Sequence, residues 1–206
     1  MMILKMAFRR SMPLFVVLAA LVLLLGMTGT AVAAGRNYQF YNGDVCRDRM
    51  LSSCLSQSGV MNYGTLFQGV YGSSTKWRAG SGNGSTNRCA TNAGPIPQGT
   101  TAIGTHYDNK SSGLIHGRAW TLADMRCVAG DPNSTLRTEL FLHTEETSSQ
   151  GQTCGSPYDE QWCWDGTNDY FSVGCVKVSH ADVATVDTKW HAGSVGSPTF
   201  SVDPWN

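Results

Sequence analysis

The sequence has few charged residues and no cluster of one sign. Its 206 residues include 15 Lys and Arg and 15 Asp and Glu. Three of the basic residues (Lys5, Arg9 and Arg10) stand near the N-terminus, which leaves 12 basic and 15 acidic residues after residue 34, a net charge of about −3. Because no Lys/Arg cluster remains there, we expect neither nucleic acid nor an anionic membrane surface as a partner.

Other features are missing as well. The sequence has no internal repeat, no linker that would divide it, and no long stretch of helical periodicity. The spacings typical of metal sites, Cys-x-x-Cys and His-x-x-x-His, are also absent. We therefore expect a single domain built from short strands, with neither a metal ion nor a cofactor. The sequence does not indicate an oligomeric state.

The first 34 residues have the pattern of a secretory signal peptide. The basic residues come first, residues 14–25 are an unbroken apolar run, and Ala31-Val32-Ala33-Ala34 follows. The apolar run is shorter than the roughly 18 to 20 residues that span a bilayer as a helix. We expect residues 1–34 to be removed and residues 35–206 to be exported to the periplasm or beyond, without stable membrane insertion. An uncleaved membrane anchor is the alternative.

All seven cysteines come after this segment. An exported chain enters an oxidising compartment in which cysteines tend to pair, and an odd number leaves at least one over. We expect the pairs Cys46–Cys54, Cys89–Cys127 and Cys154–Cys163, which leave Cys175 free, although other connectivities remain open.

The residues after position 34 have the pattern of a mainly β protein. Gly, Ser, Thr and aromatic residues are frequent, and alternating or β-branched segments are separated by turn residues. We expect a β-sandwich or a small barrel with one or two short helices, one of them capped by Ser179 and running through Asp187. Residues 145–169 are expected to form a disulfide-braced loop. The expected strands are residues 37–41, 65–71, 75–79, 100–104, 114–122, 138–144 and 199–202.

Cys175 stands in a segment suited to catalysis. In Ser172-Val173-Gly174-Cys175, a glycine directly before the cysteine allows a tight turn and a close approach to a substrate carbonyl. Backbone N–H groups in such a turn can face a developing oxyanion. A thiol attacks as the thiolate, so it needs a base or a positive neighbour. A buried structural cysteine is the alternative reading.

Three segments together resemble the YkuD-type L,D-transpeptidases and the peptidoglycan-targeting toxin effectors related to them. Ser172-x-Gly174-Cys175-Val176 is similar to the family's Ser-x-Gly-Cys motif, and Pro97-x-Gly99 looks like its Pro-x-Gly strand entry. The segment from Arg137 to His143 is similar to the strand that ends in the family's histidine. The resemblance covers residues 94–178. It departs from the family in the long gap between His143 and Cys175 and in Lys177, which stands where arginine is common.

The resemblance implies an L,D-transpeptidase-like catalytic domain over residues 35–206 that acts on peptidoglycan stem peptides. His143 would take the proton of Cys175, a thioester would form, and an amine or water would resolve it. Ser172 would orient the histidine or help to bind substrate, and backbone N–H groups at Gly174 and Cys175 would hold the oxyanion. We also expect substrate contacts from four side chains: Arg137, Lys177, Trp162 and Trp164. Lys177 as a solvated charge and the tryptophans as loop packing are the alternatives.

The remaining histidines are less suited to the role of base. Ile115-His116-Gly117 copies the family's Ile-His-Gly triplet, but His116 follows Gly99 too closely, so we favour His143. We expect His106, His180 and His191 to be surface or packing residues.

Two other functions stay open at this point. The first is hydrolysis by an L,D-carboxypeptidase or endopeptidase, including one that acts as an antibacterial toxin. The second is a secreted, disulfide-rich wall-binding module without catalysis, in which Cys175 is structural.

Overall fold

The computed structural model describes residues 35–42, 63–69, 73–83, 85, 87–154, 170–194 and 196–203. All of them belong to one compact unit, Ala33–Asn206. Several expectations lie outside the described residues: the signal peptide, the Cys46–Cys54 pair, Cys163, and most of the 145–169 loop with Trp162 and Trp164.

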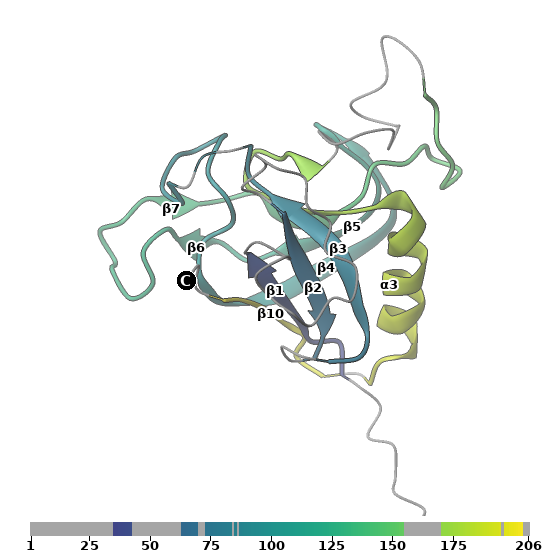
Figure 1. The fold of residues 1–206 in the computed structure, drawn as a ribbon, viewed down its shortest axis with the longest axis horizontal. Helices are drawn as coiled ribbons and strands as arrows, with labels where there is room; N and C mark the ends of the chain where they lie inside the picture. The colour runs from purple at the N-terminus through teal and green to yellow at the C-terminus, as the bar shows by residue number, and fades with distance from the viewer. Residues whose placement is uncertain are drawn as a thin grey trace, which may run out of the picture. The chain divides into compact units, whose positions relative to one another are not determined.

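Eight strands of the described chain form a closed barrel (Figure 1), so the chain is mainly β as expected, and a barrel rather than a sandwich. Around the barrel the order is β1, β10, β4, β5, β8, β9, β3 and β2, with β2 pairing back to β1. Their bounds are β1 Tyr38–Asn42, β2 Tyr63–Gln68, β3 Lys76–Ser81, β4 Gly99–Ser112, β5 Ile115–Leu122, β8 Leu140–His143, β9 Val176–Val178 and β10 Thr199–Val202.

Strand alternation separates the main core from a second face. In β8, Leu140 and Leu142 belong to the main core, so Phe141 and His143 point to the other face. Val176 and Val178 in β9 also belong to the core, which leaves Lys177 on the other face.

The β4–β5 hairpin is the longest element pair. Only residues 100–104 of β4 were expected as strand, but β4 continues to Ser112. Its outer half is mostly polar and exposed, so it lacks the apolar alternation that indicates a strand in a sequence. A two-residue turn of Gly113 and Leu114 joins the strands, and Gly113 has a φ of 74°.

Helix α3 (His180–Ala192) follows β9 directly. The Ser179 side chain accepts a hydrogen bond from the Asp182 N–H at 3.1 Å, which confirms the predicted cap. The helix runs one turn further than Asp187. The Trp190 ring lies 6.4 Å from that of Tyr38 and 6.1 Å from that of Trp120, so the helix packs against the barrel (Figure 1).

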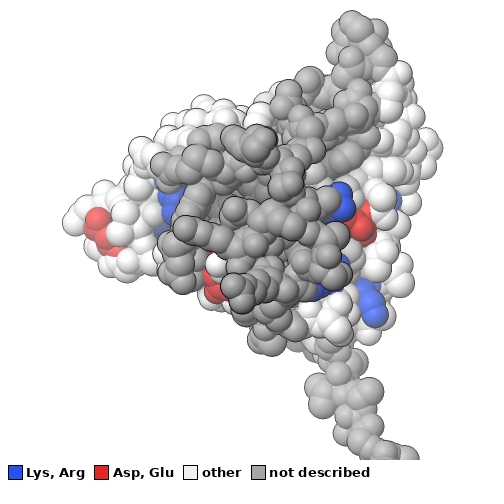
Figure 2. Space-filling view, viewed as in Figure 1, with Lys and Arg blue, Asp and Glu red and all other residues white. Residues whose placement is uncertain are grey.

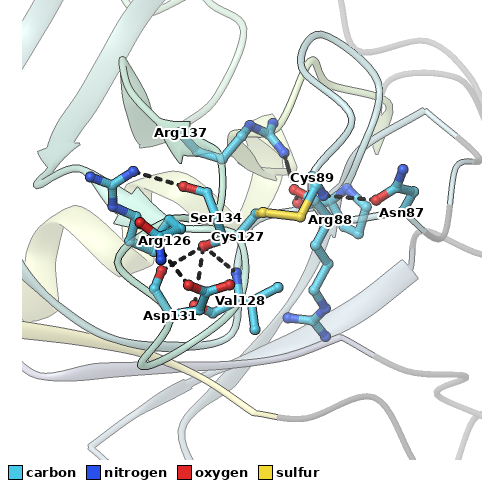
Figure 3. The surroundings of a disulfide bond; sticks show 11 residues. Asn87, Arg88, Cys89, Arg126, Cys127, Val128, Asp131, Ser134 and Arg137 are labelled. Carbon is cyan, nitrogen blue, oxygen red and sulfur yellow. Dashed lines mark hydrogen bonds between the residues drawn. A yellow bond between two sulfur atoms is a disulfide. The ribbon is translucent and has the colours of Figure 1, made fainter.

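A second, two-stranded sheet lies beside the barrel and was not expected from the sequence. It consists of β6 (Met125–Arg126) and β7 (Leu136–Arg137). The predicted disulfide Cys89–Cys127 is confirmed and joins β6 to the loop before β4 (Figure 3). Cys154 is disulfide-bonded too.

The described surface carries both charge signs. On the face in Figure 2, Lys and Arg side chains lie among Asp and Glu side chains, without a continuous patch of either sign in the described part. No helix in the described ranges combines the length and the apolar character that crossing a membrane requires.

Candidate active site

A cavity of about 640 Å³ lies over the face of β8 and β9 that is turned away from the main core. It holds both Cys175 and His143. Its other lining residues come from the β4–β5 hairpin, β8, β9 and the two connecting loops: Lys110, Ser112, Gly113, Leu114, Ile115, Glu139, Phe141, Glu145, Phe171, Ser172, Val173 and Lys177.

Strand register places the two central side chains on the same surface. Strands β8 and β9 are parallel, with His143 opposite Lys177 and Leu142 opposite Val176. Cys175 comes one residue before Val176 and therefore faces the same side as Lys177 and His143. The sequence prediction that His143 and Cys175 share a site thus agrees with the geometry of the sheet, although their catalytic roles stay predictions.

Cys175 is the free thiol among the described cysteines and is 5% exposed. Its Sγ donates to the backbone oxygen of Glu139 at 3.6 Å. Burial raises the thiol pKa to about 11, against the opposing effects of the Phe141 backbone N–H and the positive charges of Lys177 and Arg137. The described structure contains no hydrogen bond between Cys175 and His143. The thiol in this structure is therefore protonated at neutral pH.

His143 is held in one tautomer. Its Nδ1 lies 2.9 Å from the carbonyl oxygen of Thr144. Because a carbonyl only accepts hydrogen bonds, Nδ1 carries the proton and the Nε2 lone pair stays available. Burial, helped by the positive charge of Lys177, lowers the His143 pKa to about 3. The ring is therefore neutral at pH 7 with Nε2 unprotonated, and a pKa this low makes it a weak base in this state.

Lys177 is buried rather than solvated, which corrects one of the sequence readings. Its side chain is 8% exposed, and its Nζ forms an ion pair with Oε1 of Glu145, which is 4% exposed. Both residues line the cavity. The ammonium group thus places a fixed positive charge beside His143 and near the thiol.

The Ser172 hydroxyl holds the turn before Cys175. It donates to the Cys175 carbonyl oxygen at 2.6 Å and accepts from the N–H groups of Gly82 at 2.9 Å and Gly174 at 3.2 Å. None of these contacts is to His143, and the expectation that Ser172 orients the histidine or helps to bind substrate stays a prediction. The contacts also occupy the Gly174 N–H, which was expected to face an oxyanion.

The Arg137 side chain holds the same turn through hydrogen bonds to backbone carbonyl oxygens. Its guanidinium donates to the carbonyl oxygens of Arg88 at 2.6 Å, Gly94 at 3.3 Å and Val173 at 3.1 Å (Figure 3 shows its place beside the disulfide). Gly174 has a φ of 128°, and a Cβ atom there would overlap Nη2 of Arg137. Arg137 does not line the cavity, so its position supports a role in holding the loop rather than the expected substrate contact.

Sequence reasoning missed two acidic residues of the cavity. Glu139 has a φ of 55°, which is uncommon for a residue with a side chain. Its backbone carbonyl oxygen accepts the hydrogen bond from the Cys175 thiol. No sequence signal marks Glu139. Glu145 follows His143 by two residues, and its place in an acidic pair directly after the histidine strand was a readable signal.

The other histidines lie elsewhere. His116 is in β5 opposite Ser111 and does not line the cavity, although Ile115 beside it does. Nδ1 of His180 lies 3.1 Å from Oε1 of Glu146. His106, expected as a surface or packing residue, stacks on the ring of Trp120 at 4.8 Å. Among the described residues one group of His and Asp side chains converges as metal ligands do, and none of its members lines this cavity.

No family model matches the chain, and no curated protein matches its sequence. Similar solved structures include Bd1075 of Bdellovibrio bacteriovorus, with a TM-score of 0.43 and 13% identity, covering 84% of this chain and 50% of that one. An L,D-transpeptidase from Xylanimonas cellulosilytica has a TM-score of 0.36 and 16% identity, covering 90% of this chain and 69% of that one. The chain spans half the length of the Bdellovibrio protein. Likenesses this distant do not bear on the function of the chain.

Proposed function

We propose that the chain is an exported cysteine enzyme that acts on peptidoglycan stem peptides by L,D-transpeptidase-like acyl transfer. One observation carries the proposal. Cys175, the free thiol among the described cysteines, lines one cavity with a buried histidine whose Nε2 is unprotonated. The resemblance of residues 94–178 to the transpeptidase motifs supplies the substrate class.

The chemistry starts from two neutral groups. As Cys175 Sγ attacks the carbonyl carbon of a stem-peptide bond, Nε2 of His143 takes the thiol proton. The C–N bond of the tetrahedral intermediate then breaks, and the departing amine takes this proton from His143. A thioester on Cys175 remains. An acceptor amine, or water, gives up a proton to His143 and attacks the thioester, and the thiolate leaves and is reprotonated.

The neighbouring charges favour the sulfur anion that the reaction needs. The positive charges of Lys177 and Arg137 both lower the thiol pKa, against the larger effect of burial. Before attack, the thiol must turn away from the Glu139 carbonyl and toward His143. Substrate bound in the cavity would then place its carbonyl carbon within reach of the sulfur atom.

The charge of the cavity suits a substrate that carries both amino and carboxyl groups. Lys110, Glu139 and the Lys177–Glu145 pair all line it. Stem peptides carry free carboxylates and amines. Trp162 and Trp164 remain proposed contacts that lie outside the described residues.

Turnover of purified sacculi and of tetrapeptide muropeptides, followed by chromatography and mass spectrometry, tests the proposal. We expect Cys175→Ala to abolish turnover, and His143→Ala to lower it by about 10² to 10⁴. His116→Ala is the matched control and should turn over like the parent chain. Undiminished turnover by Cys175→Ala would refute the proposal. Added amine acceptor separates transfer from hydrolysis, because only transfer incorporates it into the product.

A wall-binding module without catalysis is the second candidate. The deep burial of the thiol favours it, since a structural cysteine has the same raised pKa. In that case the parent chain and Cys175→Ala should bind sacculi equally, and neither should release or join a peptide.

A further inference from the structure

Four side chains converge between strand β4 and helix α3, away from the cavity. They are His106 and Asp108 from β4, and Asp187 and His191 from α3. One ligand-type atom from each, a histidine Nε2 or an aspartate Oδ1, lies within 4.8 Å of all the others.

The spacing of the residues explains why they meet. His106 and Asp108 are two apart, so they project from the same face of their strand. Asp187 and His191 are four apart and lie one above the other on the helix surface. The packing of Trp190 against Trp120, which is opposite His106 in the β4–β5 ladder, brings the two faces together.

The four ligand-type atoms lie close together without hydrogen bonds between them. Nε2 of His106 lies 3.0 Å from Oδ1 of Asp187 and 4.0 Å from Oδ1 of Asp108. Nε2 of His191 lies 3.4 Å and 3.9 Å from the same two oxygens. None of these contacts has the geometry of a hydrogen bond. Nε2 of His106 and Oδ1 of Asp187 are fully buried and have no hydrogen-bond partner. Buried polar atoms are normally hydrogen-bonded, so these two atoms, which contact each other only as an ion pair, are suited to bind a ligand.

We propose that these four residues bind a divalent transition-metal ion of the zinc type. Four donors at about 2.0 to 2.2 Å from a tetrahedral zinc ion lie about 3.3 to 3.6 Å from one another. The four His–Asp separations of 3.0 to 4.0 Å bracket that value, and the remaining His–His and Asp–Asp pairs lie within 4.8 Å, so side-chain movement would complete the tetrahedron. Two imidazoles with two carboxylates suit zinc, whereas calcium and magnesium prefer an all-oxygen set.

The site combines a fixed inner half with an accessible outer half. The side chains of His106 and Asp187 are 11% and 17% exposed, and the Trp120 ring stacks on the His106 imidazole. Those of Asp108 and His191 are 73% and 56% exposed. An ion can therefore enter from solvent and be closed over by the outer pair. Bound metal would clamp α3 to β4.

Zinc titration of the chain, purified without a histidine tag and with its disulfides oxidised, tests the proposal. After treatment with a chelator, we expect uptake of one equivalent of Zn²⁺ and a higher midpoint of thermal unfolding. Mg²⁺ and Ca²⁺ should not compete. Co²⁺ should give the visible absorption of a tetrahedral site. Failure to bind Zn²⁺, or competition by Ca²⁺, would overturn the proposal without any variant.

Variants of the exposed ligands locate the ion and leave the core intact. We expect Asp108→Asn and His191→Ala each to weaken Zn²⁺ binding by at least about tenfold. Asp124→Asn and His116→Ala are the matched controls and should bind as the parent chain does. Cys175→Ala should also keep the site, which separates this proposal from the enzyme proposal. Binding that survives in the Asp108→Asn/His191→Ala double variant but disappears in Cys175→Ala would place the ion at the thiol and refute the site.

Discussion

Gly174 and Arg137 occupy one small space behind the candidate nucleophile. A Cβ atom on Gly174 would overlap Nη2 of Arg137, and the same Nη2 donates to the carbonyl oxygen of Val173 at 3.1 Å. The turn that presents Cys175 is thus shaped from behind by an arginine that does not reach the cavity. Its conformation depends on a residue without a side chain.

Gly174→Ala should therefore destabilise the protein by more than backbone strain alone. A side chain at a φ of 128° costs about 1 to 3 kcal/mol, and displacement of the guanidinium adds to this cost. Gly99→Ala is the matched control, because Gly99 has a φ of 129° and the added Cβ would meet only Cε of Met125 at 3.8 Å, an ordinary contact. Urea unfolding of both variants measures the difference. Equal losses would show that Arg137 moves aside without cost.

The Cys175 thiol should react slowly with iodoacetamide at neutral pH. Because its pKa is raised from 9.0 to about 11, its thiolate fraction below pH 9 is about a hundredfold smaller than that of an unperturbed thiol. The alkylation rate of the folded protein, followed by mass spectrometry, should rise about tenfold per pH unit from pH 7 to 10. The same protein in denaturant, with disulfides intact, provides the reference rate. Equal rates for the folded and unfolded chains at pH 7 would contradict the burial of the thiol.

Replacing His143 should make the free energy of unfolding less dependent on pH in mild acid. The folded pKa of His143 is lowered from 6.5 to about 3, so between these values the unfolded state binds the proton and the folded state does not. Stability due to this residue is present above pH 6.5 and falls by about 1.4 kcal/mol per pH unit as the pH drops toward 3. Urea unfolding from pH 7 to 4 should give a shallower slope for His143→Gln. His116→Gln, outside the cavity, should keep the parent slope.

Replacing Lys177 should lower the free energy of unfolding strongly only if Glu145 keeps its negative charge. Lys177→Met leaves a buried carboxylate without its ammonium partner, and breaking a buried pair in this way costs about 3 to 5 kcal/mol. The double variant Lys177→Met/Glu145→Gln should recover most of this loss. Lys189→Met, a partly exposed residue of α3, should change stability by less than about 0.5 kcal/mol. Thermodynamic cycles from denaturant unfolding measure the coupling, and a purely additive result would show that the pair is not coupled.

The sequence was sufficient for the parts of the fold that follow local rules. The Ser179 cap depends on one hydroxyl and the N–H groups next to it, β10 alternates apolar and polar residues, and β5 and β8 are rich in apolar residues. The outer half of β4 could not be predicted, because its polar residues are held in the strand by pairing with β5. Strands β6 and β7 have two residues each and show no period.

The candidate site, like the fold, could be predicted only in part from the sequence. Ser172, Gly174 and Cys175 stand together in a motif, and the resemblance places His143. Which atoms these residues touch depends on contacts far apart in the sequence. Arg137 reaches Arg88 and Val173, and the Ser172 hydroxyl accepts from Gly82, so neither role could be derived from the motif itself. The His106–Asp187 convergence depends on how α3 packs and is similarly hidden.

The barrel closes through a pair of strands from opposite ends of the described chain. Tyr38 in β1 lies opposite Phe200 in β10, and the two strands are parallel. Such a pairing forms only after a very long loop is closed, so its entropic cost is met late in folding and slows it. Until residues 199–202 pair, both β1 and β4 keep an edge of unpaired backbone N–H and C=O groups. Those two edges are where an incompletely folded or truncated chain would pair with another copy and aggregate.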